Sequence, residues 1–233
     1  MTLIPNEEVS ARTALMIGSE GVQKLQGAHV VIAGLGGVGG HCAEALARAG
    51  IGRLTLIDAD TVSPSNLNRQ AFATRSTIGM KKTEAAALRL RDISDAELTL
   101  IDTFLLPETI EGTLPADADA VADCIDSVPA KIGLAVWGKT HGVPVVASMG
   151  AGNRMDPSAF SVRDIYETSG CPLARKLRHE LRKAGIEKLD VVVSAEEAKK
   201  LPAGSPIGSI APVPAAAGLV LAAAIIRKLL ERS

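Results

Sequence analysis

The 233-residue chain is 47% apolar, carries a net charge of −1 and has only five aromatic residues. This composition excludes a disordered or collagen-like chain, and so few rings argue against a site built on stacked bases. The near-zero charge gives no overall attraction to nucleic acid, so such binding would require a local basic patch.

The first half of the chain alternates short apolar strands with helices. Residues 29–33 (HVVIA) are typical of a buried parallel strand, 34–40 of a tight glycine turn, 41–49 of a helix and 53–57 of a second strand. The pattern continues with a helix at 81–92, strands at 98–101 and 120–125, a helix at 129–141 and a strand at 144–148. Such alternation predicts an α/β fold with a doubly wound, mostly parallel Rossmann-like sheet.

The second half predicts a mixed C-terminal extension. Strands are expected at 161–164 and 190–194, a basic helix at 173–184, and a proline-rich loop at 198–214. The apolar run 213–226 has 14 residues, whereas a spanning helix needs about 20. We therefore expect a buried helix there, with contact to a membrane surface or to a dimer partner as the alternative, within one domain that covers residues 1–233.

The cysteines indicate a reducing compartment. Cys42, Cys124 and Cys171 are odd in number, and no two are spaced as C-x-x-C, which argues against a disulfide framework or a four-cysteine zinc site. The N-terminus shows no basic segment followed by an apolar stretch, so no signal peptide is visible. A cytoplasmic location is expected.

The turn at 34–39 has the pattern G-x-G-x-x-G between a strand and a helix, formed by Gly34, Gly36 and Gly39 with Gly37 between them. In this pattern the first glycine permits the tight turn, the second lets a phosphate approach, and the third lets helix and strand pack closely. Asp58 ends the next strand, where a carboxylate can accept ribose hydroxyls. Together these features predict nucleotide binding.

Further polar residues favour a triphosphate over a nicotinamide. Asn66, Arg69 and Lys82 are donors placed just beyond a strand end, and Asp126 ends the strand predicted at 120–125 on the same edge. A carboxylate that faces a triphosphate is a natural Mg²⁺ ligand. Taken singly, Arg69 or Lys82 could be a solvated surface charge and Asp126 a helix cap.

These segments resemble the ubiquitin-activating-enzyme-like (ThiF/MoeB-type) adenylating superfamily. The matching segments are 34–39, 56–60, 66–70, 79–82 and 126–127. In that family a substrate carboxylate attacks the α-phosphate of ATP, which gives an acyl-adenylate and pyrophosphate. The resemblance implies an ATP-binding part over 1–150 and a part over 151–233 for substrate and dimer contacts.

The resemblance also implies roles for individual residues. Asp58 would hold the ribose, and Asn66, Arg69 and Lys82 the phosphates, so alanine at Arg69 or Lys82 is expected to lower turnover with little loss of folding. Asp126 would bind Mg²⁺ and orient the attacking group, and Asp60 and Ser127 would line the same site. Arg12 would act across a homodimer on the partner's γ-phosphate.

Within the superfamily, the chain is most similar to the tRNA threonylcarbamoyladenosine dehydratase branch. The similar segments are 12–18, 45–58, 125–131, 150–157, 164 and 172–178. This branch adenylates the carboxylate of threonylcarbamoyladenosine in tRNA, and ring closure then expels AMP. The tRNA is the implied partner, and no DNA partner is expected.

Other functions remain open from the sequence. The main alternative is adenylation of the C-terminal glycine of a ubiquitin-like sulfur-carrier protein, although the paired C-x-x-C zinc ligands of many such enzymes are absent. Cys171 stands where the dehydratase branch is expected to carry aspartate, so a thiol role and a sulfur-transfer protein partner stay open. A nicotinamide-dependent dehydrogenase and a non-catalytic nucleotide-binding regulator are further alternatives.

The helix predicted at 173–184 is amphipathic, with leucines at 173, 177 and 181 on one face. Its basic residues are Arg175, Lys176, Arg178, Arg182 and Lys183. They form either a solvated face or a contact with the tRNA phosphate backbone.

Overall fold

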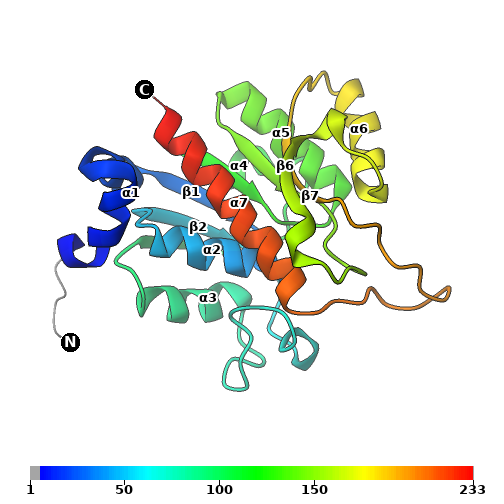
Figure 1. Ribbon diagram of the computed structural model, residues 1–233, viewed down its shortest axis with the longest axis horizontal. Coiled ribbons are helices and arrows are strands. Elements are labelled where there is room, and N and C mark those ends of the chain that lie inside the picture. Colours follow the sequence, from blue (N-terminus) through cyan, green and yellow to red (C-terminus); the bar gives the residue numbers. More distant parts are fainter. Residues whose placement is uncertain (1–5, 233) are drawn as a thin grey trace.

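The computed structural model describes residues 6–232 and contains a seven-stranded sheet with helices on both faces (Figure 1). The strand order is β3-β2-β1-β4-β5-β7-β6. Neighbouring strands run parallel except β6 and β7, which are antiparallel. The strands are β1 (His29–Ala33), β2 (Arg53–Ile57), β3 (Glu97–Ile101), β4 (Ala120–Asp123), β5 (Val145–Ser148), β6 (Phe160–Asp164) and β7 (Asp190–Ser194). The predicted doubly wound, mostly parallel fold is confirmed.

The central strands are apolar because both faces of the sheet are covered. Every residue of β1 is buried, and β1 pairs with β2 on one side and β4 on the other. The edge strand β3 instead alternates exposed and half-buried residues. The chain winds outward from β1 to β3 and then resumes at β4 on the other side of β1. In such sheets ligands bind where the winding reverses, which here is at the carboxyl ends of β1 and β4.

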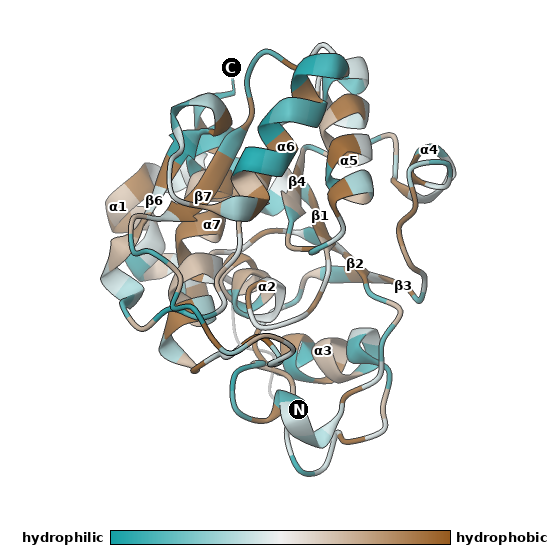
Figure 2. Ribbon diagram, turned by 90° about the vertical axis from the view of Figure 1, so that its right-hand side faces the viewer, coloured by the Kyte–Doolittle hydropathy of each residue, from teal (hydrophilic) through white to brown (hydrophobic). Residues whose placement is uncertain are grey.

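Two apolar clusters cover the two faces of the sheet, and Figure 2 shows the helices stacked on either side. Helices α1 (Asn6–Gly27), α2 (Gly39–Arg48), α3 (Lys82–Arg91) and α7 (Pro212–Glu231) contribute to one cluster. Helices α4 (Ile110–Thr113), α5 (Val128–His141) and α6 (Pro172–Lys183) contribute to the other. Residues 6–232 also contain three short 3-10 helices: η1 (Pro64–Asn66), η2 (Pro157–Ala159) and η3 (Ile165–Glu167).

Some boundaries differ from those predicted. Strand β4 ends at Asp123 instead of 125, so Asp126 lies in the loop before α5 and does not end the strand. The predicted loop at 198–214 ends at 211, because Pro212 and Pro214 belong to the first turn of α7, where a missing N–H costs nothing. Helices α1 and α4 were not predicted.

Helix α7 has 20 residues and is apolar enough, by length and composition, to cross a membrane, but half of its most apolar window is buried inside the protein. It lies along the sheet face beside α2 (Figure 1). Gly218 permits this close approach, since a Cβ there would lie 2.4 Å from the Val38 carbonyl oxygen. These contacts agree with the expected buried helix.

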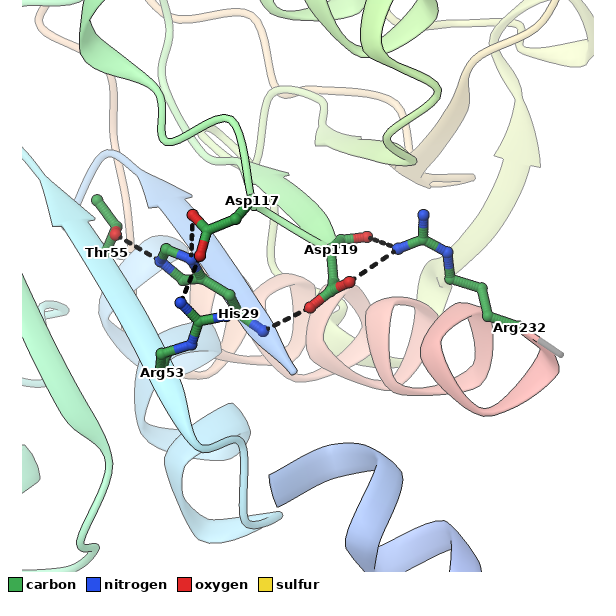
Figure 3. A network of polar contacts seen from close by, with 6 residues as sticks. All are labelled: His29, Arg53, Thr55, Asp117, Asp119 and Arg232. Carbon is green, nitrogen blue, oxygen red and sulfur yellow. Dashed lines mark hydrogen bonds and ion pairs between the residues drawn. The ribbon is translucent and has the colours of Figure 1, made fainter. Parts of the chain in front are cut away.

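The far end of α7 is tied to the amino ends of the strands (Figure 3). Arg232 donates to the Asp119 carbonyl oxygen at 2.7 Å, and the Asp119 carboxylate accepts from the His29 backbone N–H at 2.9 Å. Asp117 forms an ion pair with Arg53 and contacts His29. This network therefore fastens β1, β2 and α7 at the edge opposite the glycine turn.

Candidate active site

A cavity of about 560 Å³ opens at the carboxyl ends of β1, β2 and β4. It lies where the winding of the sheet reverses. The predicted residues that line it are Gly34, Gly36, Gly37, Asp58, Asp60, Asn66, Arg69, Lys82, Asp126 and Ser127. Gly39 and Arg12 were also predicted for the site, but they do not belong to the cavity lining.

The glycine turn packs against its own helix. Gly34 has φ +91°, and a Cβ on Gly39 would lie 1.7 Å from the Gly34 carbonyl oxygen, so both positions require glycine. Helix α2 begins at Gly39 without a side-chain cap and without an acidic residue in its first turn. The positive end of the helix dipole makes this helix start suitable for an anion.

Asp58 organises the turn as well as lining the cavity. Its carboxylate accepts from the Leu35 backbone N–H at 2.7 Å and from the Asp60 backbone N–H at 2.9 Å. A carboxylate has about four acceptor positions, so two bonds leave capacity for ribose hydroxyls.

Lys82 is buried and ion-paired. Its ammonium lies 2.6 Å from Asp60 and 3.7 Å from Asp58, and its side chain is only 8% exposed. This geometry bears on the expectation that alanine at Lys82 would scarcely affect folding, because the substitution would remove the partner of the buried Asp58 and of the half-exposed Asp60. The sequence spacing gave no sign of this pairing.

Asn66 ends η1, and Arg69 follows it in the segment between β2 and α3. The Asn66 side chain accepts from the Ser63 backbone N–H at 3.1 Å, so it shapes the loop from a buried position. The Arg69 Nη1 atom donates to the Ser65 carbonyl at 2.9 Å and to Asn68 Oδ1 at 2.8 Å. Its Nε and Nη2 groups make no hydrogen bond with any described residue, and they remain available to an anion in the cavity.

Asp126 is exposed in the cavity wall and pairs with no side chain in the part of the chain that the structure describes. Residues 6–232 contain no group of three or more His, Cys, Asp or Glu side chains that could hold a metal ion. Mg²⁺ usually binds one or two carboxylates together with substrate phosphates and water. The free carboxylate of Asp126 beside an anion-binding turn fits that mode of binding.

Sequence reasoning missed part of the cavity wall. Thr103, Phe104 and Leu105 line it from the segment after β3, and Phe104 is 68% exposed. A signal was available, because this segment follows a parallel strand that ends at the same edge of the sheet.

The cysteines do not offer a reactive thiol to the cavity. Cys124 lines it, but a hydrogen bond with Cys42 and burial raise the pKa of the Cys124 thiol well above its ordinary value. Cys171 is buried in the apolar cluster under α6 and does not line the cavity. A thiolate nucleophile requires electropositive, partly exposed surroundings that lower the pKa of the thiol.

The basic residues of α6 fall into two groups, those with intramolecular contacts and those that are exposed without such contacts. Arg178 donates to the Thr168 carbonyl at 2.8 Å, Arg182 lies 5.0 Å from the centre of the Tyr166 ring, and Lys183 pairs with Glu180. Arg175 and Lys176 are exposed and make no side-chain contact of this kind with a described residue. Figure 2 shows the hydrophilic outer side of this helix.

Arg12 lies on α1 and is exposed, outside the cavity of its own chain. The same helix exposes Leu15 and Met16, which are 86% and 84% accessible.

Comparison with known proteins extends this geometry. The ThiF family matches residues 10–233. The chain is 37% identical to the tRNA threonylcarbamoyladenosine dehydratase of Bacillus subtilis, over 95% of this chain and 94% of that protein. It is 40% identical to the enzyme of the same name from Escherichia coli, over 73% of this chain and 64% of that protein.

Solved structures agree. The Escherichia coli tRNA N6-threonylcarbamoyladenosine dehydratase in complex with ATP has a TM-score of 0.89 and 34% identity, with 98% of this chain and 97% of that chain covered. Its complex with AMP gives a TM-score of 0.90 at the same identity and coverage.

Proposed function

Because the chain belongs to the ThiF family, we propose that it is an ATP-dependent enzyme that dehydrates N6-threonylcarbamoyladenosine in tRNA to its cyclic form. The observation that carries the proposal is the likeness, over 98% of this chain, to a dehydratase of that name with ATP bound. The cavity at the switch point of the sheet supplies the matching anion-binding geometry.

The reaction has two steps. The threonyl carboxylate attacks the α-phosphate of ATP, so a C–O–P bond forms and pyrophosphate leaves. An internal nucleophile of the carbamoyl group then attacks the activated carbonyl, which closes the ring and expels AMP with loss of a proton. Water is thereby removed at the expense of one ATP.

In this proposal, residues of the chain bind ATP and neutralise the charge of its phosphates. The glycine turn and the start of α2 receive phosphate oxygens, and Arg69 and Lys82 oppose the charge that develops on the leaving pyrophosphate. Asp58 holds the ribose while it orders the turn through Leu35. Asp126 lies free for the phosphate end of the site.

The charge balance of the cavity supports two further groups. Asp58, Asp60 and Asp126 outnumber Arg69 and Lys82 among its charged lining residues, so a triphosphate would be under-neutralised. Mg²⁺ on Asp126 would polarise the phosphates and offset their charge. Arg12 from the partner of a homodimer would add another positive charge.

A homodimer is supported by α1. Two large apolar side chains, Leu15 and Met16, are almost fully exposed one helix turn from Arg12. Adjacent exposed apolar residues of this kind commonly belong to an interaction surface. We therefore propose a dimer contact at α1 in addition to the substrate and dimer contacts proposed for residues 151–233.

The tRNA would be held through its phosphates. The exposed side chains of Arg175 and Lys176 are the best candidates for contact with tRNA phosphates. The side chains of Arg178, Arg182 and Lys183 also make intramolecular contacts. The free cysteines support a reducing, cytoplasmic setting. A sulfur-transfer protein partner has no support from the buried Cys171.

The test of the function uses purified protein, ATP, Mg²⁺ and tRNA that carries threonylcarbamoyladenosine. We expect AMP and pyrophosphate in equal amounts, and a nucleoside lighter by one water by mass spectrometry. Unmodified tRNA is the control and should give no AMP. Absence of both products with the modified tRNA would refute the function.

Variants of the two cavity cations separate chemistry from folding. Arg69→Ala should lower kcat about 10²- to 10³-fold, the typical cost of losing one transition-state donor, while its melting temperature changes little because its contacts are exposed. Lys82→Ala should lower both turnover and melting temperature. Equal melting losses in the two variants would contradict this.

A further inference from the structure

Asn68 stands between the arginine of the cavity and a distant loop. Its Oδ1 atom accepts from Arg69 Nη1 at 2.8 Å, and its Nδ2 atom donates to the Ser209 carbonyl at 3.0 Å. A guanidinium only donates and a carbonyl only accepts. The amide can therefore satisfy both neighbours in one orientation only, and a carboxylate at this position would lose the second bond.

The loop that Asn68 contacts is itself held in place. Asn153 donates its backbone N–H to the Gly208 carbonyl at 2.7 Å, and its Oδ1 atom accepts from the Gly208 N–H at 2.6 Å. Its carbonyl also accepts from the Lys199 N–H at 2.7 Å. Asn153 is the non-glycine residue with positive φ (58°) within residues 6–232, so its unusual conformation is maintained by these three bonds.

A connected path thus runs from Asn153 to Arg69, made of hydrogen bonds and of the peptide bond between Gly208 and Ser209. It passes through the segment 208–209 and the amide of Asn68. At its end, Nη1 of Arg69 is fixed by Asn68 and the Ser65 carbonyl, which leaves Nε and Nη2 for the cavity. The direction of those two donors follows from how Nη1 is held, because the guanidinium is planar and rigid.

We propose that Asn68 is a positioning residue for the adenylation step: its amide fixes the Arg69 guanidinium and couples it to the loop between β7 and α7, residues 195–211. This rests on the proposed role of Arg69 as a phosphate ligand. Asn68 itself does not line the cavity, so it acts through Arg69. The position of the loop, which the Asn153 contacts set, thereby becomes a condition for correct phosphate contact.

The experiment is a double-mutant cycle on AMP release. Asn68→Ala should lower kcat about tenfold or more, the usual scale for a hydrogen bond to a charged group, with a melting temperature close to that of the wild type. In an Arg69→Ala background the same change should have no further effect, since residues that act as one unit are non-additive. Ser65→Ala, in the same turn, retains the backbone acceptor and should match the wild type.

The loop side is tested with Asn153→Gly. Glycine tolerates the positive φ but lacks the acceptor for Gly208, so we expect a lower kcat that disappears when Asn68→Ala is already present. Independent, multiplicative losses in either cycle, or unchanged kcat in Asn68→Ala, would overturn the proposal.

The Asn68–Arg69 cycle is repeated on ATP binding alone by calorimetry, which needs no tRNA. A wild-type protein that binds ATP but releases no AMP with the modified tRNA would refute the function and leave the test of Asn68 intact. If Asn68→Ala weakened ATP binding equally with and without Arg69, Asn68 would not act through Arg69.

Discussion

Asp123, at the end of β4, and Lys131, in the first turn of α5, form a fully buried ion pair, and the segment between them carries Asp126. The Lys131 ammonium donates to Asp123 at 3.0 Å and to the Ser148 carbonyl at 2.9 Å, which joins the ends of β4 and β5 to α5. Asp123 Oδ2 is the buried side-chain atom without a hydrogen-bond partner among the described residues. Burial raises the pKa of the Asp123 carboxyl above its ordinary value, and Lys131 offsets this only in part.

Lys131→Met should therefore destabilise the fold by about 3–5 kcal/mol, the usual cost of leaving a buried charge unpaired. Urea unfolding measures this. Lys139→Met, on the exposed side of the same helix, is the matched control and should cost under about 1 kcal/mol. The double variant Asp123→Asn with Lys131→Met should recover part of the loss, and no recovery would contradict the ion-pair explanation.

The stability of the single variant Lys131→Met should depend on pH in a definite direction. Without Lys131 the folded-state pKa of Asp123 lies still further above its unfolded value of about 3.9. The folded state then binds more protons than the unfolded state, so stability is lost as pH rises through this window. The difference from wild type should grow from pH 4 upward, and a difference that shrinks with rising pH would be inconsistent with it.

At the scale of elements, α2 and α7 pack closely beside the glycine turn. A Cβ at Gly218 would lie 2.4 Å from the Val38 carbonyl and 3.0 Å from the Cys42 nitrogen, both backbone atoms. Gly218→Ala should cost about 1–3 kcal/mol, as overpacking does, and weaken ATP binding because Val38 belongs to the glycine turn. Ala223→Ser, on the exposed side of α7, should alter neither quantity.

The network in Figure 3 gives a second element-scale prediction. The hydrogen bond from Arg53 lowers the pKa of Asp117 below its ordinary value. The contribution of the Asp117–Arg53 pair to the stability of the fold is therefore present above about pH 4 and is lost as pH falls through the lowered pKa of Asp117. Melting temperatures of Asp117→Asn and wild type should differ slightly at neutral pH and converge in acid. The effect is small because the pair is exposed.

Local patterns explain which elements were predictable. The parallel strands β1 and β2 and the glycine turn carry their signal in consecutive residues, as apolar runs and fixed glycine spacing. The antiparallel pairing of β6 with β7 depends on contacts about 30 residues apart, and the pairing of Lys82 with Asp60 depends on side-chain direction. Neither is encoded in a short segment, so neither could be predicted.

At the scale of the whole molecule, the proposed dimer predicts that Arg12 acts in the cavity of the partner subunit, which can be tested. If Arg12 serves the partner's cavity, then Arg12→Ala and Asp126→Ala proteins are each inactive but complement each other on mixing. Free exchange of subunits in equal amounts gives about a quarter of the sites both intact residues. Activity of the mixture near that level, with a dimer by analytical ultracentrifugation, is expected. A monomer, or no complementation after exchange, would remove the role.

The strand order also determines when the sheet can be completed during synthesis. Strand β5 leaves the ribosome more than 40 residues before β7, its neighbour in the sheet, and β6 emerges in between without a partner. Domains begin to fold while the chain is still being made. The edge of β5 therefore stays unpaired until residues 190–194 appear, and an open strand edge is a site for wrong association. In this protein the nascent chain therefore carries an open strand edge throughout the interval between β5 and β7.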